Sequence, residues 1–160
     1  MLAELQRAGV RYVVIGGMAA ALRGSPVLTQ DVDVCPARDL QNLQSLARAL
    51  RSLAARIRTD TEPAGLPFAC NAEFFARVQM VNLVTRCGDL DVSFQPSGTA
   101  GYEDLRANAE CLELGPGLSP AIASLADVIR SKTAADRPKD RAALPALRTL
   151  EAEIRRRRGE

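Results

Sequence analysis

Apolar and polar positions follow two different periods along this chain, so helices and strands are expected to alternate. Between Arg38 and Arg58 the apolar residues recur every three or four positions with arginines between them, as in an amphipathic helix. Short apolar runs bounded by glycine or charged residues predict strands at 11–15, 30–34, 79–85 and 89–94. Helices are predicted at 2–8, 17–23, 38–58, from Ser124 through Ala135, and from Pro138 to about Arg158 with a kink near Pro145.

Two segments interrupt this alternation. Residues 59–70 contain two prolines, a glycine and no period, so we expect a loop that could touch a substrate. Around Gly115-Pro116-Gly117 a second hairpin is expected, between 111–114 and 118–122. The pattern predicts one domain over 1–160, with an α/β core over 1–122 and helices over 123–158.

Composition narrows the class of protein. With 160 residues and 47% hydrophobic content the chain can bury one good core, and a net charge of +2 does not by itself indicate nucleic-acid binding. The absence of histidine excludes histidine-dependent triads within this chain. A charged N-terminal segment and the lack of a long apolar stretch predict a cytoplasmic protein with no membrane partner. Its thiols are expected to be reduced, and their wide spacing argues against structural zinc: Cys35, Cys70, Cys87 and Cys111.

The first candidate site lies where the apolar run 12–15 stops at Gly16-Gly17 and a second run carries Asp31-Val32-Asp33. Paired glycines after a strand predict a tight turn into a helix, where the backbone can approach phosphates closely. Alternation places Asp31 and Asp33 on one face of the second strand. Because like charges on one face repel each other, they indicate a site for a hard divalent cation or another cationic partner.

A third acid is expected in Asp89-Leu90-Asp91-Val92, where alternation places both aspartates on the same strand face. We favour Asp91 for the site because it lies deeper in the apolar run. Asp89 remains the alternative.

The glycine pair, the Asp31-x-Asp33 motif and a later acid on a separate strand together resemble the nucleotidyltransferase superfamily, which includes the DNA polymerase beta fold. The C-terminal part is similar to small bacterial nucleotidyltransferase-like proteins related to the abortive-infection toxins of type IV toxin–antitoxin systems. This similarity rests on the run from Ser124 to Lys132 and on Arg137-Pro138-Lys139-Asp140. The resemblance covers about residues 10 to 150 and implies an α+β fold: a mixed β-sheet flanked by helices, with a C-terminal helical segment.

The resemblance implies transfer of a nucleoside monophosphate from a nucleoside triphosphate to a hydroxyl on RNA, protein or a small molecule. Two Mg²⁺ ions, with Mn²⁺ as an alternative, would be held by Asp31, Asp33 and Asp91, with Asp33 bridging both ions and Asp91 accepting the hydroxyl proton. The expected nucleotide-binding residues are Gly16, Gly17, Thr29, Lys132 and Lys139. A cognate toxin or antitoxin is the expected protein partner.

A second hypothesis stays open at this point. Relatives carry an arginine near Val27 and a second acid near Ala142-Ala143, and both are missing here. The fold could therefore serve as a non-catalytic nucleotide-binding or antitoxin-like protein. Lys132 and Asp140 would then be ordinary charges on exposed helix faces, and the arginines of 38–58 a solvated face.

Overall fold

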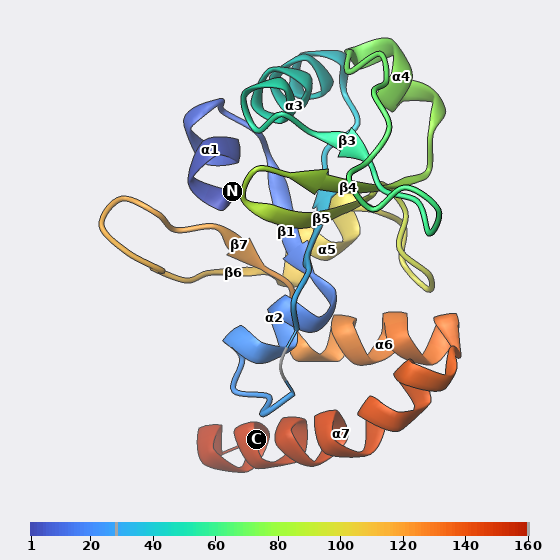
Figure 1. Ribbon diagram of the computed structural model, residues 1–160. Helices are drawn as coiled ribbons and strands as arrows, with labels where there is room; N and C mark the ends of the chain where they lie inside the picture. Colours follow the sequence, from blue (N-terminus) through green and yellow to red (C-terminus); the bar gives the residue numbers. More distant parts are fainter. Residues whose placement is uncertain (28, 160) are drawn as a thin grey trace.

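A seven-stranded mixed β-sheet forms the centre of the molecule (Figure 1). The computed structural model describes residues 1–27 and 29–159. The strand order is β3-β4-β5-β2-β1-β7-β6; β2 with β5 and β1 with β7 are parallel, and the other neighbours are antiparallel. The strands are β1 (Tyr12–Ile15), β2 (Val32–Pro36), β3 (Arg56–Ile57), β4 (Met80–Thr85), β5 (Gly88–Ser93), β6 (Glu110–Cys111) and β7 (Ala121–Ile122). The predicted mixed sheet flanked by helices is confirmed.

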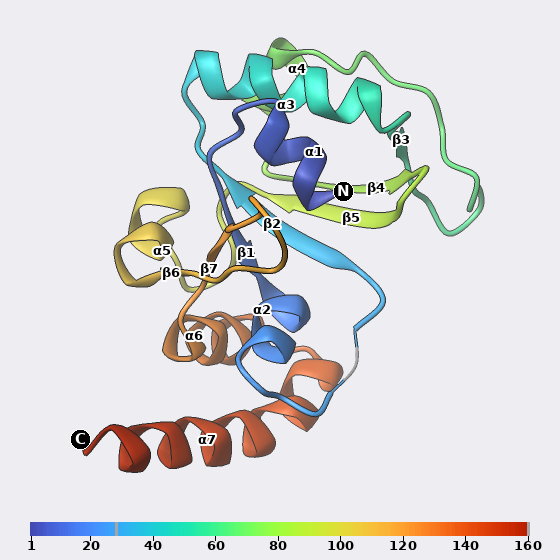
Figure 2. The same cartoon turned by 90° about the vertical axis from the view of Figure 1, so that its left-hand side faces the viewer.

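The helices lie on both sides of this sheet. Figures 1 and 2 show α3 and α4 on one side of β4 and β5, with α6 and α7 on the other side and α7 farthest from the sheet. Helix α6 packs against α2 and α7. The helices are α1 (Leu2–Arg7), α2 (Gly16–Leu22), α3 (Leu40–Ser52), α4 (Ala72–Arg77), α5 (Tyr102–Asn108), α6 (Leu125–Ala135) and α7 (Pro138–Arg158).

Helix α3 covers the sheet as its apolar period predicts. Leu43, Leu46 and Leu50 are at most 2% exposed and pack into the core formed with the strand residues. Asp39 begins the helix, because its side chain accepts a hydrogen bond from the Asn42 backbone N–H.

The predicted end of this helix at residue 58 is wrong. The helix ends at Ser52, where Ala54 adopts a left-handed conformation with φ of 52° and the N–H of Ala55 bonds back to the Leu50 carbonyl. Ile57 then pairs with Leu83 as part of β3. A short apolar segment fits both periods, so periodicity alone could not separate the helix from the edge strand.

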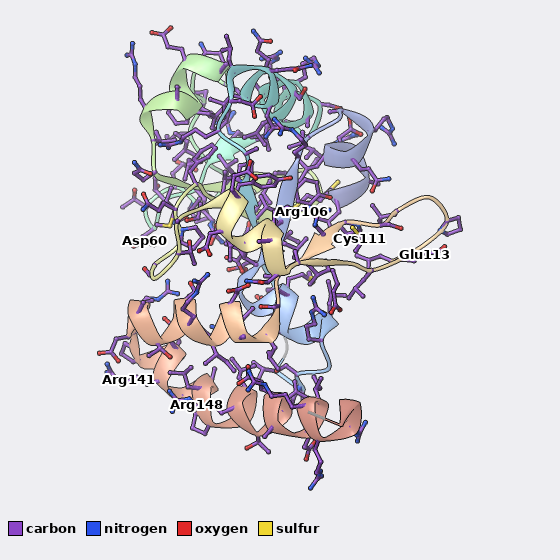
Figure 3. The ribbon with its side chains drawn as sticks, turned by 180° about the vertical axis from the view of Figure 1, so that it is seen from behind. Asp60, Arg106, Cys111, Glu113, Arg141 and Arg148 are labelled. Carbon is purple, nitrogen blue, oxygen red and sulfur yellow. The ribbon has the colours of Figure 1, made fainter. Side chains whose placement is uncertain are left out.

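The shorter elements were predicted less well. Helices α4 and α5 were not predicted, although Asn71 caps α4 by accepting a hydrogen bond from the Phe74 N–H at 2.8 Å. The second hairpin exists, but its strands β6 and β7 have only two residues each. Figure 3 shows its loop projecting from the body near Cys111 and Glu113. Ser124 caps α6 as expected, and α7 continues through Pro145.

All four cysteines are free thiols. In the described ranges, no helix combines the length and the apolar character needed to cross a lipid bilayer.

Candidate active site

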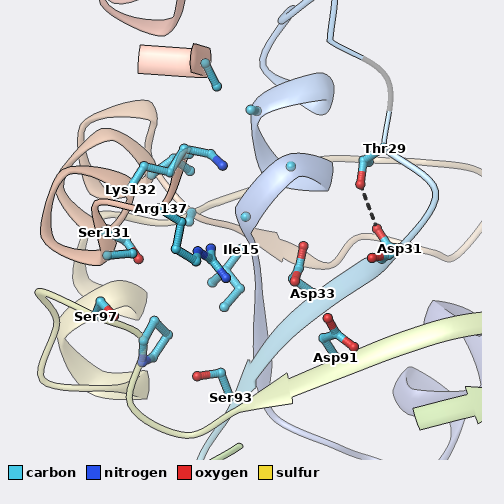
Figure 4. A pocket seen from close by; sticks show the side chains of 18 of the residues that line it. Ile15, Thr29, Asp31, Asp33, Asp91, Ser93, Ser97, Ser131, Lys132 and Arg137 are labelled. Atoms are coloured by element: carbon cyan, nitrogen blue, oxygen red, sulfur yellow. Dashed lines mark hydrogen bonds between the residues drawn. The ribbon is translucent and has the colours of Figure 1, made fainter. Parts of the chain in front are cut away.

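Two aspartates face the same cleft from neighbouring parallel strands. Asp33 of β2 lies in register with Asp91 of β5, so their side chains lie on the same face of the sheet. Asp31 precedes β2 by one residue, and all three acids line a cleft of about 670 Å³. Figure 4 shows Asp31, Asp33 and Asp91 on one side of this cleft. The structure therefore places Asp31 and Asp33 along the same cleft as Asp91, which comes from a distant part of the sequence.

Two acids of the cleft, Asp33 and Asp91, have raised pKa values. Burial raises the pKa of Asp33 to about 6, and the negative charges of Asp91 and Asp31 act in the same direction. Burial also raises the pKa of Asp91, although Arg58 opposes this shift. Without positive charge nearby, such a group of carboxylates is electrostatically unfavourable. This property is expected of a site that binds a cation.

Each glycine of the pair lies in close contact with a side chain, Gly16 with Asp33 of the acidic wall and Gly17 with Thr29. Gly16 has a φ of +62°, and a Cβ there would overlap the Asp33 carboxylate and lie 2.8 Å from its Cγ. A Cβ on Gly17 would lie 3.0 Å from Thr29 Oγ1. The Thr29 hydroxyl donates to the Asp31 carbonyl at 3.2 Å within the segment that leads into β2, and the Thr29 side chain lies against Gly17 at the start of α2.

The opposite wall of the cleft is basic. Figure 4 shows Lys132 and Arg137 across the cleft from Asp33, and Lys139 lines the same space. Within the described chain, Lys139 forms no ion pair, and its charge acts on both Asp33 and Asp91. The cleft thus has one wall of each sign, an arrangement suited to a phosphorylated ligand with associated cations.

A buried acid holds two of these cations in place. Asp140 is fully buried and accepts hydrogen bonds from Lys132 Nζ at 3.0 Å and from Arg137 Nε at 2.6 Å. Burial alone would raise the pKa of Asp140, but hydrogen bonds from Arg137 and Lys132 lower it. The reading of Lys132 and Asp140 as ordinary exposed charges is therefore wrong.

The interpretation of Arg58 as part of a solvated helix face is also wrong, because Arg58 lies beyond α3 and lines the cleft. Its guanidinium forms ion pairs with Asp89 and, at 2.9 Å, with Asp91. Asp91 lines the cleft, whereas Asp89 pairs with Val84 in the sheet and is not among the lining residues. Of the two candidates, the acid preferred from the sequence, Asp91, is thus the one that lines the cleft, and its role as the third acid stays a prediction.

The chemistry of the acidic wall fits Mg²⁺ or Mn²⁺. Three carboxylates provide only oxygen donors, which hard divalent cations prefer. As the side chains stand, no three acidic or cysteine residues of the described segments are grouped closely enough to enclose a metal ion. Arg58 also donates a hydrogen bond to one carboxylate oxygen of Asp91, which a metal ion would need as a ligand. Metal binding by all three acids therefore stays a prediction.

Sequence reasoning missed several residues of this cleft. Extending the Asp89–Asp91 alternation by one step would have found Ser93, which lines the cleft beside Asp91. Arg58 carried no local signal, because it reaches the cleft from the end of β3. Arg137 belongs to the segment on which the family resemblance rests, but it was not assigned to the site. The remaining uncharged polar residues that line the cleft are Ser25, Gln79, Asn82, Gln95, Ser97 and Ser131.

Comparison with known proteins identifies the fold. No protein-family model and no curated protein matches the sequence. A candidate nucleotidyltransferase of Thermotoga maritima is similar in structure, with a TM-score of 0.52 and 17% identity over 98% of this chain and 86% of that chain. The antibiotic-resistance factor ANT(2'')-Ia gives a TM-score of 0.51 and 14% identity, over 99% of this chain and 89% of that one. Identity this low shows the fold alone, so the conclusion is that the chain has a nucleotidyltransferase-type fold.

Proposed function

We propose that this chain is a metal-dependent nucleotidyltransferase, which moves a nucleoside monophosphate from a nucleoside triphosphate to a hydroxyl of RNA, protein or a small molecule. The observation that carries the proposal is the register of Asp33 with Asp91 across a cleft from three cations. The cations are Lys132, Arg137 and Lys139. The likeness to a candidate nucleotidyltransferase over nearly the whole chain supports the same reading.

The two walls suggest how the substrate binds. The triphosphate, which carries several negative charges, would contact the basic wall, with Lys139 free to approach it and Asp140 keeping Lys132 and Arg137 in place. Gly16 and Gly17 present no side chain, so phosphate oxygens could approach the start of α2 closely. Mg²⁺, or Mn²⁺ in its place, would be held by Asp31, Asp33 and Asp91 and would supply the positive charge that neutralises the phosphates and activates the hydroxyl.

The transfer itself then needs a base and a leaving group. Asp91 would accept the proton of the acceptor hydroxyl while the oxygen of that hydroxyl bonds to the α-phosphorus. The bond from the α-phosphorus to the β-phosphate oxygen breaks, and pyrophosphate leaves with its electron pair. Lys132 and Arg137 would stabilise the charge on the departing pyrophosphate.

Incubation with each labelled nucleoside triphosphate, Mg²⁺ and cellular RNA or lysate tests this proposal. Wild-type protein should transfer label, and Asp33→Asn should lower transfer at least about 100-fold, because it removes a charge without adding bulk against Gly16. Asp60→Asn changes an exposed acid (Figure 3) that is not among the residues lining the cleft, so it should leave transfer unchanged. If wild type transfers no label and Mg²⁺ does not strengthen triphosphate binding, the enzymatic function should be abandoned.

A non-catalytic function is the second candidate, and the ion pair between Arg58 and Asp91 favours it, since this pair occupies an acid that the reaction needs. A protein of this kind would bind a triphosphate without transferring label. We also propose a cognate toxin or antitoxin partner, which rests on the sequence resemblance of 124–140. Co-purification with the product of a neighbouring gene would support that partner.

A further inference from the structure

Four polar side chains form a row across four adjacent strands. Asp33 of β2 is in register with Asp91 of β5, and Asp91 is in register with Asn82 of β4. The backbone N–H of Arg58, which follows β3, donates to the Asn82 carbonyl at 2.9 Å and completes the row. Figure 1 shows these strands side by side. Arg58 therefore lies at one end of this row and Asp33 at the other.

Arg58 crosses a whole strand to reach its acids. Neighbouring strands lie about 4.8 Å apart, so a side chain from the β3 position must extend over β4 to contact β5. Its two terminal nitrogens divide between two carboxylates: one contacts Asp89 and the other contacts Asp91 at 2.9 Å. Arg58 and its two acids are each about a quarter to a third exposed, so a ligand in the cleft can reach them.

The other cations of the cleft are placed differently. Lys132 and Arg137 bind the buried Asp140 on the far wall, and Lys139 forms no ion pair with any described residue. In the part of the chain that the structure describes, Arg58 is the side chain that forms an ion pair with Asp91. Its guanidinium therefore supplies the positive charge that a metal ion would bring to this acid.

We propose that Arg58 is a counter-ion that competes with the divalent cation for Asp91. A metal that binds Asp91 displaces one nitrogen of Arg58, while Asp89 keeps hold of the other and retains the arginine beside the site. Arg58 is thus a positioning residue that sets metal affinity. This inference rests on the proposed function, since it takes Asp91 as a metal ligand.

The test measures Mn²⁺ binding to the purified full chain by calorimetry or by the loss of free Mn²⁺ resonance signal, with no nucleotide present. Arg58→Met removes the competitor but keeps the length of the side chain, so Mn²⁺ should bind about three- to tenfold more tightly. Asp89→Asn leaves Arg58 with Asp91 as its remaining acid partner, so Mn²⁺ should bind more weakly than to wild type. A fold defect would weaken binding in both variants, so the opposite directions separate competition from loss of structure.

The matched control is Lys139→Met. It removes the same charge from the same cleft and has no ion pair with Asp91, so it should tighten Mn²⁺ binding much less than Arg58→Met. If both variants tighten Mn²⁺ binding equally, only the overall electrostatic field of the cleft has changed, and the proposed competition is wrong. Unchanged or weaker Mn²⁺ binding to Arg58→Met would also overturn the proposal. If neither wild type nor Arg58→Met binds Mn²⁺ at millimolar concentration, the metal-dependent function fails together with this inference. Binding by wild type with no effect of Arg58→Met defeats the inference alone.

Discussion

At the scale of single residues, Asp33 shows how the fold places a charge where it is unfavourable. Its strand partner Asp91 and the nearby Asp31 both carry negative charge, and burial removes the water that would otherwise stabilise the ionised form. The Asp33 carboxylate lies next to Gly16, which has no side chain and so leaves room for it. Burying a charge in this way lowers the stability of the folded protein, and such a loss of stability is typical of functional sites.

Asp33 should therefore make unfolding depend on pH. Its pKa is about 6 in the folded protein and 3.8 ordinarily, so between these values the folded state binds more protons than the unfolded state. The free energy of unfolding falls as pH rises through this window. Asp33→Asn has no carboxylate that ionises at this position, so its free energy of unfolding should exceed that of wild type by about 1–3 kcal/mol at pH 7.5. This difference should become smaller toward pH 4.

Denaturant unfolding of both proteins from pH 4 to pH 8 measures this difference. Asp60→Asn, in the exposed loop, serves as the control and should show no comparable gain. A constant difference between Asp33→Asn and wild type across the whole range would contradict the role of Asp33 titration.

Gly16 allows a second prediction at this scale. Gly16→Ala introduces both an unfavourable positive φ and a clash with the Asp33 carboxylate, so it should destabilise the protein by about 2–4 kcal/mol. Gly9→Ala has a similar φ of +73° and nothing within 4 Å of the new Cβ, so it should lose only about 1–2 kcal/mol. Urea midpoints compare the two, and equal losses would mean that the contact with Asp33 is unimportant.

At the scale of elements, the junction of α6 and α7 determines the basic wall. The left-handed Asp136 ends α6, Pro138 begins α7, and Asp140 connects the two helices through Lys132 and Arg137. Asp140 is fully buried and Lys132 is 16% exposed, so the ion pair between them is largely shielded from solvent, whereas the Arg137 side chain is 57% exposed. The junction thus contributes both to stability and to the position of the cations.

Asp140→Ala should destabilise the protein by about 2–4 kcal/mol, because it leaves Lys132 without its buried partner. It should also weaken triphosphate binding, since Lys132 and Arg137 lose the acid that orients them. Glu151→Ala removes the surface partner of Arg155 on the same helix and should change stability by less than about 1 kcal/mol. Urea unfolding and triphosphate titration of both variants measure these effects; matching behaviour of the two variants would show that burial of Asp140 has no special importance.

At the scale of the whole molecule, the cleft lies between the sheet and the C-terminal helices, so one ligand can contact both. A triphosphate bound with Mg²⁺ at about 100 times its dissociation constant should add about 2.7 kcal/mol to the free energy of unfolding. Melting curves should show a larger rise in Tm with both ligands than with either alone. In Asp33→Asn the added effect of Mg²⁺ should disappear, and an Mg²⁺ effect that survives in this variant would place the metal elsewhere.

The sequence by itself determined which residues are chemically suited to the site. Gly16-Gly17, Asp31-x-Asp33 and Asp91 were recognisable because strand alternation and turn preferences act over a few neighbouring residues. The C-terminal helices were predictable for the same reason, whereas the mixed sheet was expected from the family resemblance. The end of α3 and the short helices α4 and α5 were not, because short segments satisfy both periods and their packing decides between them.

Only the tertiary structure decided which charges face one another. The register of β2 with β5 aligned Asp33 with Asp91, and the β3–β4 pairing brought Arg58 to the same row. The packing of α7 on α6 buried Asp140 between Lys132 and Arg137. Arg137 and Asp140 are three positions apart, whereas the other contacts join residues from 8 positions apart, from Lys132 to Asp140, to 58 positions apart, from Asp33 to Asp91. Local pattern determines a residue's face and element, whereas pairing between elements depends on the free energy of burying the whole sheet and its helices together.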